Sequence, residues 1–90
     1  PYRPSVNRLF RSLLQPGLSP GQAVLLTGMG RDGAAGLLEL RQAGWHTIAQ
    51  NASTCAVYGM PRAAIELGAA CEELPPSAIA DSLQRRLLRR

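Results

Sequence analysis

The sequence predicts an α/β domain in which a parallel sheet is covered by helices on both faces, the doubly wound three-layer architecture. A short apolar run without polar alternation, typical of a strand buried on both faces, occupies residues 22–27, and a second strand is predicted at residues 45–50. Segments with helical spacing separate the predicted strands, and glycine or proline marks their boundaries. The predicted order is one helix, then strand and helix three times, which favours parallel strands joined by crossover helices.

The first helix is predicted to begin at Pro4 and Ser5 and to end before residues 15–17. Its apolar residues recur at i, i+3, i+4, i+7 and i+8, and this spacing predicts one continuous buried stripe. The stripe consists of Val6, Leu9, Phe10, Leu13 and Leu14. Residues 18–21 form a predicted surface turn that leads into the first strand, residues 22–27.

The second helix is predicted at residues 34–43, with Gly44 at its C-terminal cap, and the second strand at residues 45–50. A loop of small and polar residues follows, and Pro61 suits the first position of a third helix. Gly68 closes that helix before a weak third strand at residues 69–74, and residues 75–77 open the last helix. The last helix carries its predicted apolar face on Ile79, Leu83 and Leu87.

Residues 1–90 are too few for more than one domain. Three parallel strands are few for a doubly wound sheet, and their outer edges would expose unpaired backbone groups. We therefore expect residues 1–90 to be the C-terminal portion of a larger domain, whose remaining part supplies further strands.

The amino-acid composition indicates which classes of partner and which cellular setting to expect. The sequence contains 46% hydrophobic residues, which favours a globular chain, and no apolar run approaches the roughly 20 residues of a membrane span. The net charge is +4, but Arg85, Arg86, Arg89 and Arg90 account for the whole excess. A solvated helix end explains them, so no nucleic-acid partner is expected. Two cysteines form neither a zinc motif nor a disulfide framework, which fits a reducing, cytoplasmic setting.

A glycine loop follows the first strand, and its residues 28–33 (GMGRDG) match the dinucleotide pattern GxGxxG. Dinucleotide binding also requires an acid about 20 residues later, where this chain has Gln50 and Asn51. Asp32 would repel a pyrophosphate, and a P-loop is excluded because the chain contains no lysine. The loop therefore lacks the residues that would support a phosphate-binding site.

Two roles for Asp32 remain open at this stage. Its carboxylate could cap the helix that follows, or it could orient a histidine as the acid of a Ser-His-Asp triad. His46, the only histidine, starts the second strand and should lie at the opposite sheet edge, roughly 15 Å away for a five-residue strand. None of the six serines has a G-x-S-x-G setting. A triad would therefore need a serine and a histidine from outside this chain.

Four segments resemble the C-terminal half of the chemotaxis protein-glutamate methylesterase domain, the CheB family. They are YRPSVNRLF, VLLTGMGRDGAAGL, TIAQNASTCAVYGMPRAAI and LGAACEELP, and the resemblance spans roughly residues 2–82. The combination of TGMGxDGAxGL with a later TIAQ…YGMPxxA is far more specific than the glycines alone.

The resemblance implies an enzyme that hydrolyses glutamate methyl esters on chemoreceptors and deamidates receptor glutamines, with a Ser-His-Asp triad and no metal or organic cofactor. It implies that Asp32 is the triad acid. Met29 and Gly30 are expected at the oxyanion or substrate cleft, with Tyr58 and Met60 on its wall. The family's serine and histidine lie outside this chain, so the chain alone is expected to be inactive.

The same resemblance implies a cytoplasmic protein with a methylated chemoreceptor as substrate and a receiver domain in the parent chain. Asn7 and Asn51 stand where the family pattern has aspartate. The alternative function is a non-catalytic, methylesterase-like interaction module in a signalling assembly.

Overall fold

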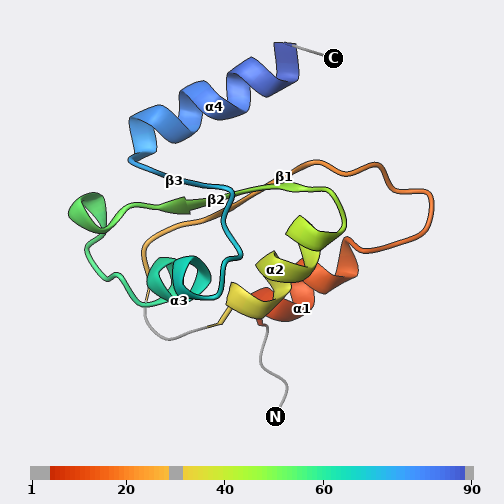
Figure 1. The fold of residues 1–90 in the computed structure, drawn as a ribbon, viewed down its shortest axis with the longest axis horizontal. Helices are drawn as coiled ribbons and strands as arrows, with labels where there is room; N and C mark the ends of the chain where they lie inside the picture. Colours follow the sequence, from red (N-terminus) through yellow and green to blue (C-terminus); the bar gives the residue numbers. More distant parts are fainter. Residues whose placement is uncertain (1–4, 29–31, 89–90) are drawn as a thin grey trace.

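The computed structural model describes residues 5–28 and 32–88. Helices and strands follow one another in the predicted order (Figure 1). The elements are α1 (Val6–Ser12), β1 (Gln22–Leu25), α2 (Ala34–Gln42), β2 (His46–Gln50), the 3₁₀ turn η1 (Ala52–Thr54), α3 (Met60–Glu66), β3 (Glu72–Leu74) and α4 (Pro76–Leu88).

The three strands form a parallel sheet in the order β1-β2-β3. Gln22 pairs with His46, and Ile48 pairs with Glu72, so the strands start at the same edge. The α/β class and the parallel sheet are as predicted. The third strand is shorter than predicted because residues before it complete α3: the Ala69 N–H donates to the Ala64 carbonyl at 2.8 Å.

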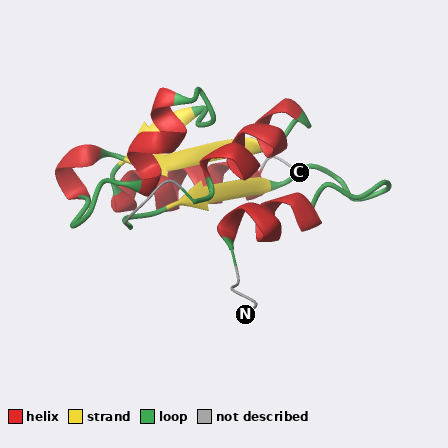
Figure 2. Cartoon of the chain, turned by 90° about the horizontal axis from the view of Figure 1, so that it is seen from below, coloured by secondary structure: helices red, strands yellow, loops and turns green. Residues whose placement is uncertain are grey.

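The sheet is the middle of three layers. Figure 1 shows α1, α2 and α3 on one face and α4 alone on the other, and Figure 2 looks onto the sheet from the side of the three helices. α2 and α3 pack on β1 and β2, whereas α4 packs on β2 and β3. The main core lies between the sheet and the three-helix layer, where Leu37 and Leu40 are fully buried.

Two predicted apolar faces are wrong in part. In α1, Phe10 is buried, but Leu9 is 61% exposed because α1 lies at the rim of the three-helix layer and packs mainly against α2. In α4, Ile79 and Ser82 are buried, whereas Leu87 is 58% exposed. Leu87 lies in the last turn of α4, beyond the part of the helix that carries the buried residues Ile79 and Ser82.

The helices were compared with the length needed to cross a membrane. The longest helix among residues 5–28 and 32–88 is α4, with 13 residues. No helix in this part of the chain is both long and apolar enough to cross a membrane.

Candidate active site at the carboxyl edge of the sheet

Asp32 lies where the chain turns from β1 toward α2, at the carboxyl edge of the sheet. In open parallel sheets this edge collects ligands and catalytic groups. The residue is half-buried. Gly33 follows it beside the end of β1, since a Cβ atom placed on Gly33 would lie 3.0 Å from Leu25 Cδ1.

The carboxylate of Asp32 is bound by the first turn of α1. Its Oδ2 accepts the Val6 N–H at 2.7 Å, and its Oδ1 accepts the Asn7 N–H at 3.3 Å. The Ser5 side chain caps the same helix by accepting the Arg8 N–H at 3.0 Å. The first three N–H groups of α1, which have no partner within a helix, are thereby all satisfied. A carboxylate is also favoured electrostatically at a helix N-terminus.

The hypothesis that Asp32 caps the helix that follows it is therefore wrong. The N-cap residue of α2 is Gly33, which has no side chain to accept an N–H of that helix. The Asn7 side chain takes over this role: its Oδ1 accepts the N–H groups of Gly33 at 3.1 Å and of Gly36 at 2.8 Å. The two helices thus cap one another.

The glycines of this turn make room for α1. Gly33 has a φ of +99°, and a Cβ atom there would lie 2.8 Å from Val6 Cγ1. A Cβ atom on Gly36 would lie 3.1 Å from both the Cα and the carbonyl oxygen of Asn7. These distances are shorter than ordinary contacts, so glycine is required for the close approach of the helix and not for a phosphate.

The loop between β2 and α3 folds back onto the end of β1. The Gly28 N–H donates to the Val57 carbonyl at 2.9 Å, and the Gly28 carbonyl accepts the Gly59 and Met60 N–H groups at 2.9 and 3.0 Å. Gly28 and Tyr58 form an isolated parallel bridge. The Met60 side chain covers Gly28 so closely that a Cβ atom there would collide with Met60 Cε.

Tyr58 reaches from this loop toward the end of β3. Its hydroxyl donates to Glu73 Oε2 at 3.1 Å. Desolvation, followed by the hydrogen bond and the negative charge of Glu73, raises the pKa of Tyr58 above its usual value of 10.0. The phenol is therefore a neutral hydrogen-bonding group.

The structure brings the predicted residues Tyr58 and Met60 to the glycine loop, and it places Asp32 at the α1 N-terminus beyond the same strand. Met29 and Gly30 lie outside the described residues. Among residues 5–28 and 32–88 no three acidic, histidine or cysteine side chains gather in a way that could hold a metal ion.

The only histidine lies at the other edge of the sheet. His46 begins β2, and its Nε2 lies 2.6 Å from Glu72 Oε2. Ser82 donates to the same oxygen at 2.8 Å. The hydrogen bond from His46, then that from Ser82, lowers the pKa of the Glu72 carboxyl below its usual value of 4.5.

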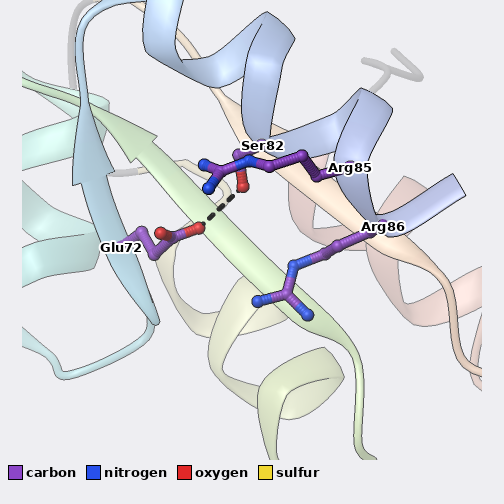
Figure 3. A pocket seen from close by; sticks show the side chains of 4 residues that line it. All are labelled: Glu72, Ser82, Arg85 and Arg86. Atoms are coloured by element: carbon purple, nitrogen blue, oxygen red, sulfur yellow. Dashed lines mark hydrogen bonds between the residues drawn. The ribbon is translucent and has the colours of Figure 1, made fainter. Parts of the chain in front are cut away.

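A hollow of about 120 Å³ opens beside this cluster and is lined by Glu72, Ser82, Arg85 and Arg86 (Figure 3). The arrangement differs from a catalytic triad, in which the histidine lies between the serine and the acid. Here the carboxylate lies between the other two, so Ser82 donates to an acid and not to an imidazole base. The cluster stabilises the contact of α4 with the sheet.

Asn7 is the site residue whose role the sequence analysis missed. It stood out only as a departure from the family pattern. One local signal exists: asparagine is a poor helix former because its side chain competes for backbone hydrogen bonds, yet Asn7 occupies the first turn of α1. In this structure the Asn7 side chain makes such backbone hydrogen bonds with the start of α2 and not with its own helix.

Several known proteins are similar to this chain. The sequence profile described as CheB methylesterase matches residues 1–83. The chain is 60% identical over 85 residues to protein-glutamate methylesterase/protein-glutamine glutaminase 2 of Burkholderia orbicola, covering 92% of this chain and 25% of that protein. It is 55% identical over 82 residues to protein-glutamate methylesterase/protein-glutamine glutaminase 1 of Rhizobium johnstonii, covering 91% and 24%.

Among solved structures, the CheB methylesterase catalytic domain of Thermotoga maritima matches with a TM-score of 0.66 and 44% identity. The match covers 69% of this chain and 33% of that structure. The chain thus spans about a quarter of the length of the two curated relatives. Since the family profile covers nearly all of its residues, the chain belongs to the CheB methylesterase family.

Proposed function

We propose that residues 1–90 are the C-terminal portion of the catalytic domain of a protein-glutamate methylesterase and that Asp32 is the acid of its catalytic triad. One observation carries the proposal: the Asp32 carboxylate is held at the carboxyl edge of a parallel sheet by backbone N–H groups of α1. Backbone donors fix its position without supplying a titrating partner.

Asp32 retains the capacity to bind a histidine. An ionised carboxylate offers about four lone-pair sites, and the two backbone donors use two of them. Oδ1, which has the longer contact, is the better acceptor for an imidazole N–H. Such a bond fixes the tautomer that accepts a proton from serine and stabilises the imidazolium that forms. The serine and the histidine come from the part of the protein that precedes this chain.

The reaction then follows from this arrangement. The serine oxygen bonds to the ester carbonyl carbon while its proton passes to the imidazole, and the tetrahedral intermediate collapses by breaking the bond to methoxide. Methoxide takes the imidazole proton and leaves as methanol. Water repeats both steps on the acyl-enzyme and releases the glutamate carboxylate. No metal or organic cofactor is needed for these steps.

The substrate is a methylated chemoreceptor, and deamidation of receptor glutamine is the related reaction with ammonia as leaving group. Met29 and Gly30 contribute to the oxyanion or substrate cleft, while Tyr58 and Met60 form its wall. In the parent chain a receiver domain regulates access, and the protein acts in the cytoplasm. The names of the matched relatives support the methylesterase and glutaminase activities.

The test compares the full-length protein with its Asp32→Asn variant in release of methanol from a methylated receptor. We expect kcat to fall by about 10⁴-fold with little change in KM, because the variant favours the wrong histidine tautomer. The 90-residue chain alone should release none. An unchanged kcat in Asp32→Asn would contradict the proposal and favour the non-catalytic interaction module.

A further inference from the structure

We propose that Asn7 is a positioning residue for Asp32, an inference that rests on the proposed function of that carboxylate. The evidence is the reciprocal capping of α1 and α2. Backbone N–H groups of Val6 and Asn7 hold the Asp32 carboxylate, and the Asn7 carboxamide oxygen holds the N–H groups of Gly33 and Gly36. One residue therefore binds both the side chain of Asp32 and the backbone directly after it.

Among these contacts, only the Asn7 side chain accepts the N–H groups of Gly33 and Gly36. Gly33 has no side chain with which to cap α2, and its φ of +99° is open to glycine at little cost. Without an acceptor at position 7, two N–H groups at the start of α2 would lose their partner in a region where Gly33 and Gly36 are buried. Buried backbone donors without partners are strongly disfavoured, so the turn would shift to find one.

Because α1 and α2 are in close contact, a shift of this turn would also move Asp32. Gly36 allows α2 to approach the backbone of Asn7 closely, and the rim of this contact is crossed by an ion pair between Arg11 and Glu39. Because the helices touch without intervening space, the turn and the N-terminus of α1 move as one unit. A misplacement of about 1 Å in a catalytic group costs about 10²-fold in rate.

The test uses the full-length protein and methanol release from a methylated receptor. We expect Asn7→Ala to lower kcat by about 10²-fold and to change KM by less than about threefold, since orientation and not substrate binding is lost. Asn7→Asp keeps an acceptor oxygen in the same place and should restore kcat to within about threefold of the wild type. This rescue distinguishes positioning from a general loss of packing.

Gln15→Ala is the matched control. Gln15 donates to the Ser12 carbonyl at 2.8 Å at the other end of α1, so its removal weakens the same helix away from Asp32. We expect kcat within about twofold of the wild type. Amide hydrogen exchange at Gly33 and Gly36 supplies a readout besides activity: exchange should accelerate in Asn7→Ala and not in Gln15→Ala. If Asn7→Ala is unfolded at the assay temperature, Asn7→Leu, which is similar in size to asparagine and has no acceptor, takes its place.

The kcat values of Asn7→Ala and Asp32→Asn together separate the role of Asn7 from that of Asp32. An unchanged kcat in Asn7→Ala, together with a loss of about 10⁴-fold in Asp32→Asn, would overturn the role of Asn7 and leave the triad acid in place. A loss in Asn7→Ala that Asn7→Asp does not restore would also overturn it. Retained activity in Asp32→Asn would overturn the proposed function itself.

Discussion

The two edges of the sheet each hold a hydrogen-bonded carboxylate, but the donors differ in kind. At the carboxyl edge, Asp32 accepts backbone N–H groups of α1. At the amino edge, Glu72 accepts two side chains, His46 and Ser82, on a single oxygen. The backbone donors are fixed by the helix that carries them, whereas the side-chain donors can rotate away.

This difference matches the roles proposed for the two carboxylates, one in the reaction and one in the structure. The donors of Asp32 fix its orientation and leave oxygen lone pairs for a further partner. Glu72 instead connects β2, β3 and α4 through its hydrogen bonds, one of which is with His46, the only histidine of the chain. The amino edge therefore contributes stability, and the carboxyl edge contributes the group proposed for catalysis.

The largest expected contrast is between substitutions at the two edges. In the full-length protein, His46→Gln should leave kcat for methanol release within about twofold of the wild type, whereas Asp32→Asn should lower it by about 10⁴-fold. The reason is that His46 pairs with Glu72, at the edge opposite Asp32. If His46→Gln abolished turnover without unfolding the protein, the assignment of the two edges would be wrong.

Gly36→Ala tests the close approach on which the carboxyl edge depends. Helix propensity alone would stabilise the protein by about 1 kcal/mol. However, the new Cβ atom would lie 3.0 Å from Phe10 Cβ and 3.1 Å from the Asn7 backbone. We expect a net destabilisation of about 1–3 kcal/mol in urea-induced unfolding, because backbone atoms yield little to overpacking. A gain in stability would show that α1 can move away at little cost.

Glu72→Gln tests the amino edge through the pH dependence of stability. The bonds from His46 and Ser82 lower the pKa of Glu72 in the folded state, so the unfolded chain binds more protons below about pH 4.5. The stabilisation is present above that pH and is lost as the pH falls through the folded-state pKa. In Glu72→Gln this part of the slope should disappear, with an effect of about 1 kcal/mol or less because the side chain is 34% exposed. Urea unfolding at a series of acidic pH values measures it, and an identical slope in both proteins would contradict the account.

Arg62→Ala gives the smallest expected effect and serves as a baseline outside both edges. Arg62 pairs with Glu66 one turn later in α3, and both side chains are exposed. We expect a loss of about 0.3–0.5 kcal/mol in the free energy of unfolding, and less in high salt. A loss above about 1 kcal/mol would mean that surface pairs stabilise this fold as strongly as the edge contacts.

Much of the fold could be predicted because the signals are local. An apolar run without alternation located β1, the strand predicted at residues 45–50 matches β2, and Gly44 and Gly68 marked helix ends with positive φ values of +95° and +75°. Burial on single helix faces was less predictable. Leu9 and Leu87 fit the helical spacing and yet are exposed, since spacing does not indicate how far a neighbouring layer extends.

The sequence named candidate site residues, but it did not indicate the hydrogen bonds that hold them. The glycine loop indicated a carboxylate at position 32, and the family pattern added Tyr58 and Met60. Capping of α1 by Asp32 joins residues 25 and 26 positions apart in the sequence. A local rule assigns a cap to the helix that follows, so only the packing of α1 on α2 could reveal that the caps are exchanged.

Proton NMR of the exchangeable imidazole protons in the full-length protein tests most directly whether Asp32 binds a histidine. A histidine N–H bound to Asp32 should give a far-downfield resonance in the wild type and in His46→Gln. This resonance should be lost or strongly shifted in Asp32→Asn, because the carboxylate acceptor is gone. A downfield resonance that is unchanged in Asp32→Asn and absent in His46→Gln would show that the observed bond is that of His46 with Glu72, and would contradict the role proposed for Asp32.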